Sequence, residues 1–170
     1  MDLIKQNTQS KIIKSLSIIF LGSIILAISA KIKIPFYPVP MTMQTFVVLF
    51  LGLSFGYKIG LSTVGLYLIE GIIGLPVFSN SPERGVGLVY FTGQTMGYLI
   101  GFLFATYVAS FIKLKDNYLI ILIKLILAVS TIYVLGVLWL GTILGWDKPI
   151  VELGIKPFLL AEIFKIMLLT

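Results

Sequence analysis

Long apolar stretches follow one another along nearly the whole chain, separated by short polar or proline-rich turns. Hydrophobic residues make up 58% of the 170 residues, charged residues only 12%, and the mean hydropathy is +1.07. A soluble domain has about a quarter charged residues and needs polar side chains to cover its surface. This chain has too few, so its apolar excess must face lipid. The sequence therefore predicts an all-α integral membrane protein.

Six of these stretches are candidates for membrane-spanning helices, each of which needs roughly 20 apolar residues. The expected spans are residues 15–34, 41–57, 58–75, 89–112, 118–146 and 157–170, within a single membrane domain. Pro35, Pro38 and Pro40 end the first span because proline lacks the backbone donor. The sixth span is short, so either its helix is tilted or the membrane thinned at its end, or the chain is cut short.

Basic residues near the span ends give a weak preference for a cytoplasmic N-terminus. The cytoplasmic side would carry six basic residues, namely Lys5, Lys11, Lys14, Lys58, Lys113 and Lys115. The outer side would carry five, namely Lys31, Lys33, Arg84, Lys148 and Lys156. The near tie suggests that some outer charges serve something other than topology. Alternatively, the N-terminus is a signal peptide cleaved after Ala27-Ile28-Ser29, which would leave five spans.

The residue types that are missing exclude several function classes. The chain has no cysteine and no histidine, which removes disulfide chemistry, the usual nucleophile pairs and most zinc sites. The net charge of +6 is scattered, with no basic tract that would indicate nucleic-acid binding. No Gly-Lys-Ser or Gly-Lys-Thr loop is present, so the chain does not itself hydrolyse ATP. It resembles a binding subunit more than a complete transport machine.

Small residues recur at every fourth position in two of the expected spans. Residues with this spacing lie on one helix face and let another backbone approach closely. One ridge consists of Gly93, Gly97, Gly101, Ala105 and Ala109, and the other consists of Gly52, Gly56 and Gly60. Ser23 and Ala27 form a similar pair in the first span. They serve either packing inside the protein or docking of another membrane protein, and spacing alone does not separate the two.

Four ionisable residues fall within the spans, where burying a charge is costly and function is the first hypothesis. Glu162 and Lys165 share a helix face and either neutralise each other or divide a ligand between them. In the second case lysine would hold a carboxylate and glutamate would accept N–H donors. Glu70 is a ligand candidate or a snorkelling or capping carboxylate, and Lys124 is expected to snorkel to the interface.

Further polar and aromatic residues gather at the outer ends of the spans. Thr42 and Gln44 follow the proline-rich turn, and Asn80 and Tyr90 flank the outer polar loop. Phe78 is one of many aromatic residues nearby. An apolar pocket with a few directed polar groups is typical of a small-ligand site, and the topology places this one at the outer membrane face.

Several segments together resemble the BioY family, the biotin-specific substrate-binding (S) components of energy-coupling-factor (ECF) transporters. The similarity covers roughly residues 25 to 168. The segments that carry it are VPMTMQT at 39–45, YLIEGIIGLPVF at 67–78, SPERGVG at 81–87, GYLIGF at 97–102, and Pro157-Phe158 followed by Glu162 and Lys165. Glu162 stands where the family usually has aspartate, and GQTMG at 93–97 stands where GPTGG is usual.

The resemblance implies a six-helix S component in the cell membrane, with cytoplasmic termini and biotin captured from outside. It implies as partners a transmembrane coupling subunit and two ATPase subunits, docked through Ser23 and Ala27. The chain would have no cofactor of its own, because the partners use the ATP. Lys165 would hold the valerate carboxylate of biotin and Glu162 the ureido N–H groups. The other implied contacts are Thr42, Gln44, Asn80 and Tyr90, with Glu70, Phe78 and Arg84 as weaker candidates.

Three alternatives stay open on the sequence alone. The same architecture could carry another vitamin, or could transport biotin without ATPase partners. The third alternative is a membrane enzyme that uses Glu70 or Glu162 as an acid or base, which the lack of histidine and cysteine disfavours.

Overall fold

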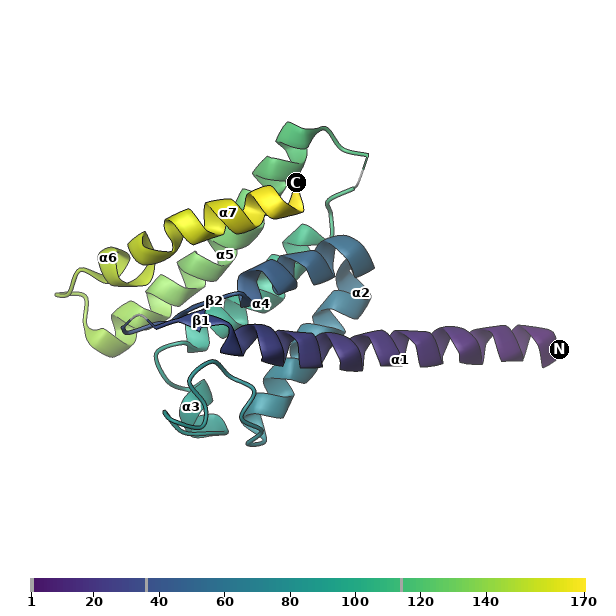
Figure 1. The fold of residues 1–170 in the computed structure, drawn as a ribbon, viewed down its shortest axis with the longest axis horizontal. Coiled ribbons are helices and arrows are strands. Elements are labelled where there is room, and N and C mark those ends of the chain that lie inside the picture. Colours follow the sequence, from purple (N-terminus) through teal and green to yellow (C-terminus); the bar gives the residue numbers. More distant parts are fainter. Residues whose placement is uncertain (1, 36, 114) are drawn as a thin grey trace.

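The apolar stretches form helices, and the proline-rich and polar stretches form the connections between them (Figure 1). The computed structural model describes residues 2–35, 37–113 and 115–170, with side chains from residue 9 onward. The helices are α1 (Asp2–Lys31), α2 (Gln44–Ile72), α3 (Leu88–Phe91), α4 (Met96–Ala109), α5 (Tyr118–Leu144), α6 (Ile150–Gly154), the 3-10 helix η1 (Lys156–Phe158) and α7 (Leu159–Leu169). The predicted helical class is confirmed.

A small β pair adds to the helical class. Strands β1 (Lys33–Ile34) and β2 (Met41–Thr42) run antiparallel and bracket the proline-rich turn that ends the first span. Lys33 lies opposite Thr42 in this pair. The sequence analysis did not predict these strands, which bring the end of α1 beside the start of α2.

Two expected spans, 41–57 and 58–75, run together in α2. The junction is Gly56, whose φ of 71° and ψ of 176° break the helix without a loop. A positive φ of this kind is readily available only to glycine. The break lies one residue before the last residue expected for the second span, so the two halves of α2 correspond to two of the six segments.

The span expected as one helix over 89–112 is interrupted. A turn separates α3 from α4, and the indole Nε1–H of Trp139 donates to the carbonyl of Gly93 at 2.8 Å. An outside donor thus takes an acceptor that a continuous helix would use. Further along, the expected loop 147–156 contains α6, and Pro157 lies in the 3-10 turn before α7.

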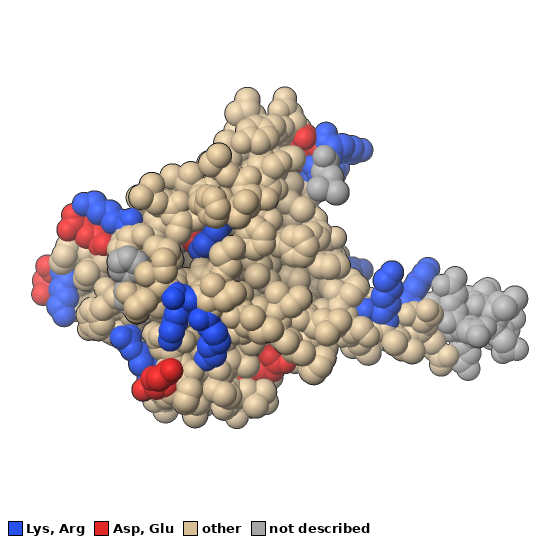
Figure 2. Space-filling model, in the orientation of Figure 1, with Lys and Arg blue, Asp and Glu red and all other residues tan. Residues whose placement is uncertain are grey.

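Within the described part of the chain, three helical segments are long and apolar enough to cross a bilayer, namely Gln9–Lys31, Gln44–Ile72 and Tyr118–Leu144, and α4 is apolar but shorter. Figure 2 shows most charged side chains at the ends of the molecule, with a broad, largely uncharged region between them. This distribution of charged side chains suits a protein whose middle faces lipid. The side chain of Lys5, which was counted above for topology, lies outside the described residues.

The glycine ridges serve packing inside the protein. Helix α4 packs against both α5 and α2. A Cβ on Gly97 would meet the backbone oxygen of Leu135, and one on Gly101 would lie 2.6 Å from the Cα of Ile132. On α2, Gly52 and Gly60 face Thr106 of α4 in the same way. Of the two interpretations of these ridges, the structure supports internal packing.

Helix α1 packs its C-terminal half on α2, while its N-terminal part projects from the bundle (Figure 1). Leu26 and Ala30 are fully buried there, so the first span contributes to the packed interior. Ser23 is also fully buried, and its hydroxyl donates to Glu70 Oε1 at 3.0 Å. The docking role expected of Ser23 does not fit this position, whereas Ala27 is partly buried.

The Lys124 side chain reaches the α4–α5 loop, as the snorkelling prediction requires. Its ammonium donates to Asp116 Oδ2 at 2.6 Å and to the Phe111 carbonyl at 3.1 Å, both at the end of the bundle near the α4–α5 loop. The hydrogen bond from Lys124 holds the pKa of the partly buried Asp116 carboxyl below its usual value. This lysine therefore belongs to the membrane boundary and not to a buried site.

Candidate functional site

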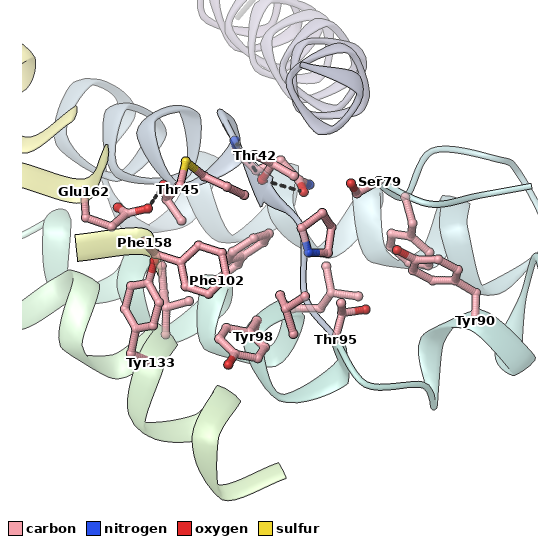
Figure 3. A pocket seen from close by; sticks show the side chains of 17 residues that line it. Thr42, Thr45, Ser79, Tyr90, Thr95, Tyr98, Phe102, Tyr133, Phe158 and Glu162 are labelled. Carbon is pink, nitrogen blue, oxygen red and sulfur yellow. Dashed lines mark hydrogen bonds between the residues drawn. The ribbon is translucent and has the colours of Figure 1, made fainter. Parts of the chain in front are cut away.

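A cavity lies between β2, the outer loop that joins α2 to α3 (residues 73–87), and helices α4, α5 and α7 (Figure 3). It holds about 530 Å³ of empty space, a volume that includes its opening to solvent. Most of its lining is apolar or aromatic. Its aromatic residues are Phe78, Tyr90, Tyr98, Phe102, Tyr133 and Phe158.

One end of the cavity is closed by the ion pair of α7. Glu162 and Lys165 are only 5% and 4% exposed, and their Oε1 and Nζ atoms are 2.8 Å apart. The Lys165 ammonium also donates to the Thr42 carbonyl at 2.7 Å and to Thr45 Oγ1 at 2.8 Å. Its three donors are therefore all used within the protein, and Lys165 does not line the cavity.

The two oxygens of the Glu162 carboxylate have different surroundings. Oε1 accepts from Lys165 and from the Thr45 hydroxyl, each at 2.8 Å. Oε2 is buried and has no hydrogen-bond partner within 3.5 Å among the described residues, and the Tyr133 hydroxyl lies close enough to interact with the Glu162 carboxylate. A buried acceptor left unpaired costs about 1–3 kcal/mol, and more when it is charged. Since Glu162 lines the cavity, Oε2 is placed to accept a donor from a ligand.

The other end of the cavity is built by β2 and the outer loop. Gln44 is held there, because its Nε2 donates to Tyr67 Oη at 2.7 Å and its Oε1 accepts from the Thr42 hydroxyl at 3.3 Å. Ser79 also lines this end, and its buried hydroxyl has no partner among the described residues. Figure 3 places Ser79 and Tyr90 on the opposite side of the cavity from Glu162.

A second hollow adjoins the first and shares Tyr90 and Thr95 with it. Asn80 and Arg84 line this second hollow. The Arg84 guanidinium donates to the Pro38 carbonyl at 3.2 Å and lies 5.8 Å from the ring centroid of Tyr37. The two hollows together form an elongated site with a buried carboxylate at one end and an exposed guanidinium beyond the other.

The structure brings most of the predicted residues together. Thr42, Gln44, Phe78, Tyr90 and Glu162 line the first cavity, and Asn80 and Arg84 line the second. Lys165 lies behind Glu162, and Glu70 is bonded to Ser23 outside both hollows.

Sequence reasoning missed Thr45, Ser79, Tyr98 and Tyr133. Thr45 follows Gln44 in the segment VPMTMQT, so it could have been predicted from the sequence. The two tyrosines lie inside apolar spans, where nothing in the sequence separates a cavity residue from a packing residue.

The fold and the site define a membrane protein with an aromatic cavity of the kind that binds a small molecule. A scan against family models matches residues 4–170 to the BioY family. The chain belongs to the BioY family.

Curated relatives and a solved structure are similar over most of the chain. The probable biotin transporter BioY of Pyrococcus horikoshii is 34% identical over 152 residues, 89% of each chain. The biotin transporter BioY of Thermotoga maritima is 31% identical over 144 residues, 84% of this chain and 83% of its own. The crystal structure of an S-component for biotin from an ECF-type ABC transporter has a TM-score of 0.78 at 26% identity, covering 94% of this chain and 88% of its own.

Proposed function

We propose that this chain is the biotin-binding S component of an ECF-type transporter and serves biotin uptake. The observation that carries the proposal is the unpartnered Oε2 of Glu162 inside an aromatic cavity. Biotin matches this site because it combines ureido N–H donors, an apolar bicyclic body and an acidic tail. Family membership makes the chain a transport component and not an enzyme.

The charges of the site favour one orientation of biotin. The neutral ureido ring lies at the Glu162 end, where its N–H groups meet Oε2. The valerate carboxylate is costly to bury and is repelled by Glu162, so it points toward the second hollow and Arg84. The ring system and alkyl chain lie between, against Phe102 and Phe158.

In this orientation Lys165 orients Glu162 and does not hold the ligand carboxylate. Its three donors already have acceptors inside the protein. Arg84, ranked as a weaker candidate on the sequence, is a cation that lines the second hollow, toward which the acid points. The two assignments predict different responses to removal of the biotin charge, which are compared in the Discussion.

Direct titration tests the ligand. Protein purified in detergent is titrated with biotin and, separately, with other water-soluble vitamins, by calorimetry. We expect submicromolar binding of biotin and no binding of the others. Biotin affinity that is micromolar or weaker, or tighter binding of another vitamin, would contradict the proposal.

The partners proposed for this chain are a transmembrane coupling subunit and two ATPase subunits in the same cell membrane. The chain itself uses no cofactor, and ATP is consumed by the partners. Uptake of labelled biotin is compared in cells that produce this chain alone and cells that also produce coupling and ATPase subunits from the same organism. Rapid uptake by the chain alone would favour a solitary transporter instead.

A further inference from the structure

Two lysines, one at the end of α1 and one at the start of β1, bind the outer loop through hydrogen bonds. The Lys31 ammonium donates to the carbonyls of Phe78 at 2.7 Å and Ser81 at 2.6 Å. The Lys33 ammonium donates to the Ser79 carbonyl at 2.8 Å and to Asn80 Oδ1 at 2.9 Å. Four consecutive loop residues therefore supply one oxygen each to these two ammonium groups.

The loop segment held in this way is a wall of the ligand site. Phe78 and Ser79 line the first cavity, and Asn80 lines the second. Lys33 lies on β1 directly opposite Thr42 of β2, which also lines the first cavity. Lys33 thus connects two segments that line the site, β2 through its strand pairing and the outer loop through its ammonium.

Lys33 also fixes which way the Asn80 amide points. Asn80 Oδ1 accepts from Lys33, and the Asn80 backbone N–H donates to Tyr90 Oη at 3.1 Å. Nδ2 makes no hydrogen bond to another described residue, so its two N–H donors are left for a ligand. The amide therefore offers donors and not an acceptor. It suits a carbonyl or carboxylate oxygen of the ligand.

We infer that Lys31 and Lys33 are positioning residues of the ligand site, which hold the Phe78–Ser81 wall in place and turn the Asn80 amide donors toward the ligand. Both lysines lie on the predicted outer side, where positive charge opposes the usual topology rule. Their bonds to the loop give these charges a function other than topology. The inference rests on the proposed function for the identity of the ligand only.

The first test removes the Lys33 ammonium and keeps its aliphatic stem. Lys33→Met is compared with Lys33→Arg, which restores a cation with several donors, and with Lys148→Met, which removes an exposed charge of the same predicted side. We expect Lys33→Met to speed biotin dissociation by about tenfold or more, equal to about 1.4 kcal/mol. Arginine should restore much of the loss, and the control should match wild type. Wild-type dissociation in Lys33→Met would overturn the inference.

A double-mutant cycle separates positioning from general destabilisation. If Lys33 acts by orienting Asn80, then Lys33→Met costs little further affinity once Asn80→Ala has removed the amide. Fully additive losses would mean that Lys33 does not act through Asn80, and would overturn that part of the inference. Melting temperatures of all variants are measured alongside. If Lys33→Met does not fold, Lys31→Met, at an exposed position, takes its place in the rate measurement.

A third measurement needs no biotin. Hydrogen exchange of the peptide covering residues 76–92 is followed in ligand-free wild type, Lys33→Met and Lys148→Met. We expect faster exchange in Lys33→Met only, because the loop has lost two of its bonds to the lysines. Unchanged exchange would overturn the positioning role. Failure of the wild type to bind biotin, with faster exchange in the variant, would instead contradict the proposed function and leave the loop assignment standing.

Discussion

At the scale of single residues, the Glu162 carboxylate gives one oxygen to the protein and keeps the other for the cavity. Lys165 and Thr45 fix the first oxygen, so the direction of the second is set before a ligand arrives. A side chain whose orientation is fixed before the ligand binds loses little conformational entropy on binding, and this favours high affinity. The buried pair therefore acts as a preorganised acceptor more than as a stabilising ion pair.

Replacing that acceptor is expected to weaken biotin selectively. In Glu162→Gln the side-chain oxygen stays with Lys165, and the amide N–H₂ then opposes the ureido donors. A hydrogen bond to a charged group contributes about 1.5–3 kcal/mol, so affinity should fall about 10- to 100-fold. Calorimetry measures the change, with Glu152→Gln as the control at an exposed carboxylate. Equal affinities of wild type and Glu162→Gln would exclude Glu162 as a contact.

A comparison of biotin with biotin amide locates the site of the ligand carboxylate. Arg84→Met should weaken biotin about tenfold, or about 1.4 kcal/mol, and leave biotin amide nearly unchanged, because only the acid carries a charge. Lys165→Met should weaken both ligands equally, since it acts through Glu162. A larger loss for biotin than for its amide in Lys165→Met would show that the initial assignment of the acid to Lys165 is correct.

At the scale of helices, the contact between α4 and α5 depends on glycine. A Cβ on Gly97 would meet the Leu135 carbonyl and lie 2.5 Å from the Trp139 side chain. Gly97→Ala should therefore force the helices apart and destabilise the protein by about 1–3 kcal/mol. Gly65→Ala on α2 is the matched control, because its Cβ would meet nothing within 4 Å. Thermal unfolding in detergent compares the two, and an equal melting temperature for both would contradict this role of Gly97.

The sequence predicted structural features correctly where these features depend on residues close together in the chain. The prolines at 35–40 mark a real helix end, the expected boundary between residues 57 and 58 lies close to the break at Gly56, and charges inside spans pointed to Glu162. It did not predict the turn before α4, because that turn depends on Trp139 reaching Gly93 from another helix. The burial of Ser23 against Glu70 was missed for the same reason. Contacts between residues that are far apart in the sequence depend on tertiary packing, and the spacing of motifs along the sequence carries no information about that packing.

At the scale of the whole molecule, the site, the β pair and α6 lie at one end, and the α4–α5 loop lies toward the other (Figure 1). The lysines that hold the outer loop belong to the first end, and the Lys124–Asp116 pair belongs to the second. If biotin is captured from outside, the first end must face outward. The direction of transport therefore rests on an orientation that basic-residue counts favour only weakly.

Labelling of single cysteines tests this orientation, and the chain suits it because it contains no cysteine. Lys148→Cys and Lys115→Cys replace exposed residues at the two ends. A membrane-impermeant maleimide should label residue 148 in intact cells, and residue 115 only after the membrane is opened. The inverse pattern would place the site on the cytoplasmic face and contradict capture from outside. Ser10→Cys adds a check on the first span, because it should also label after opening, whereas cleavage near Ala27 would remove that cysteine altogether.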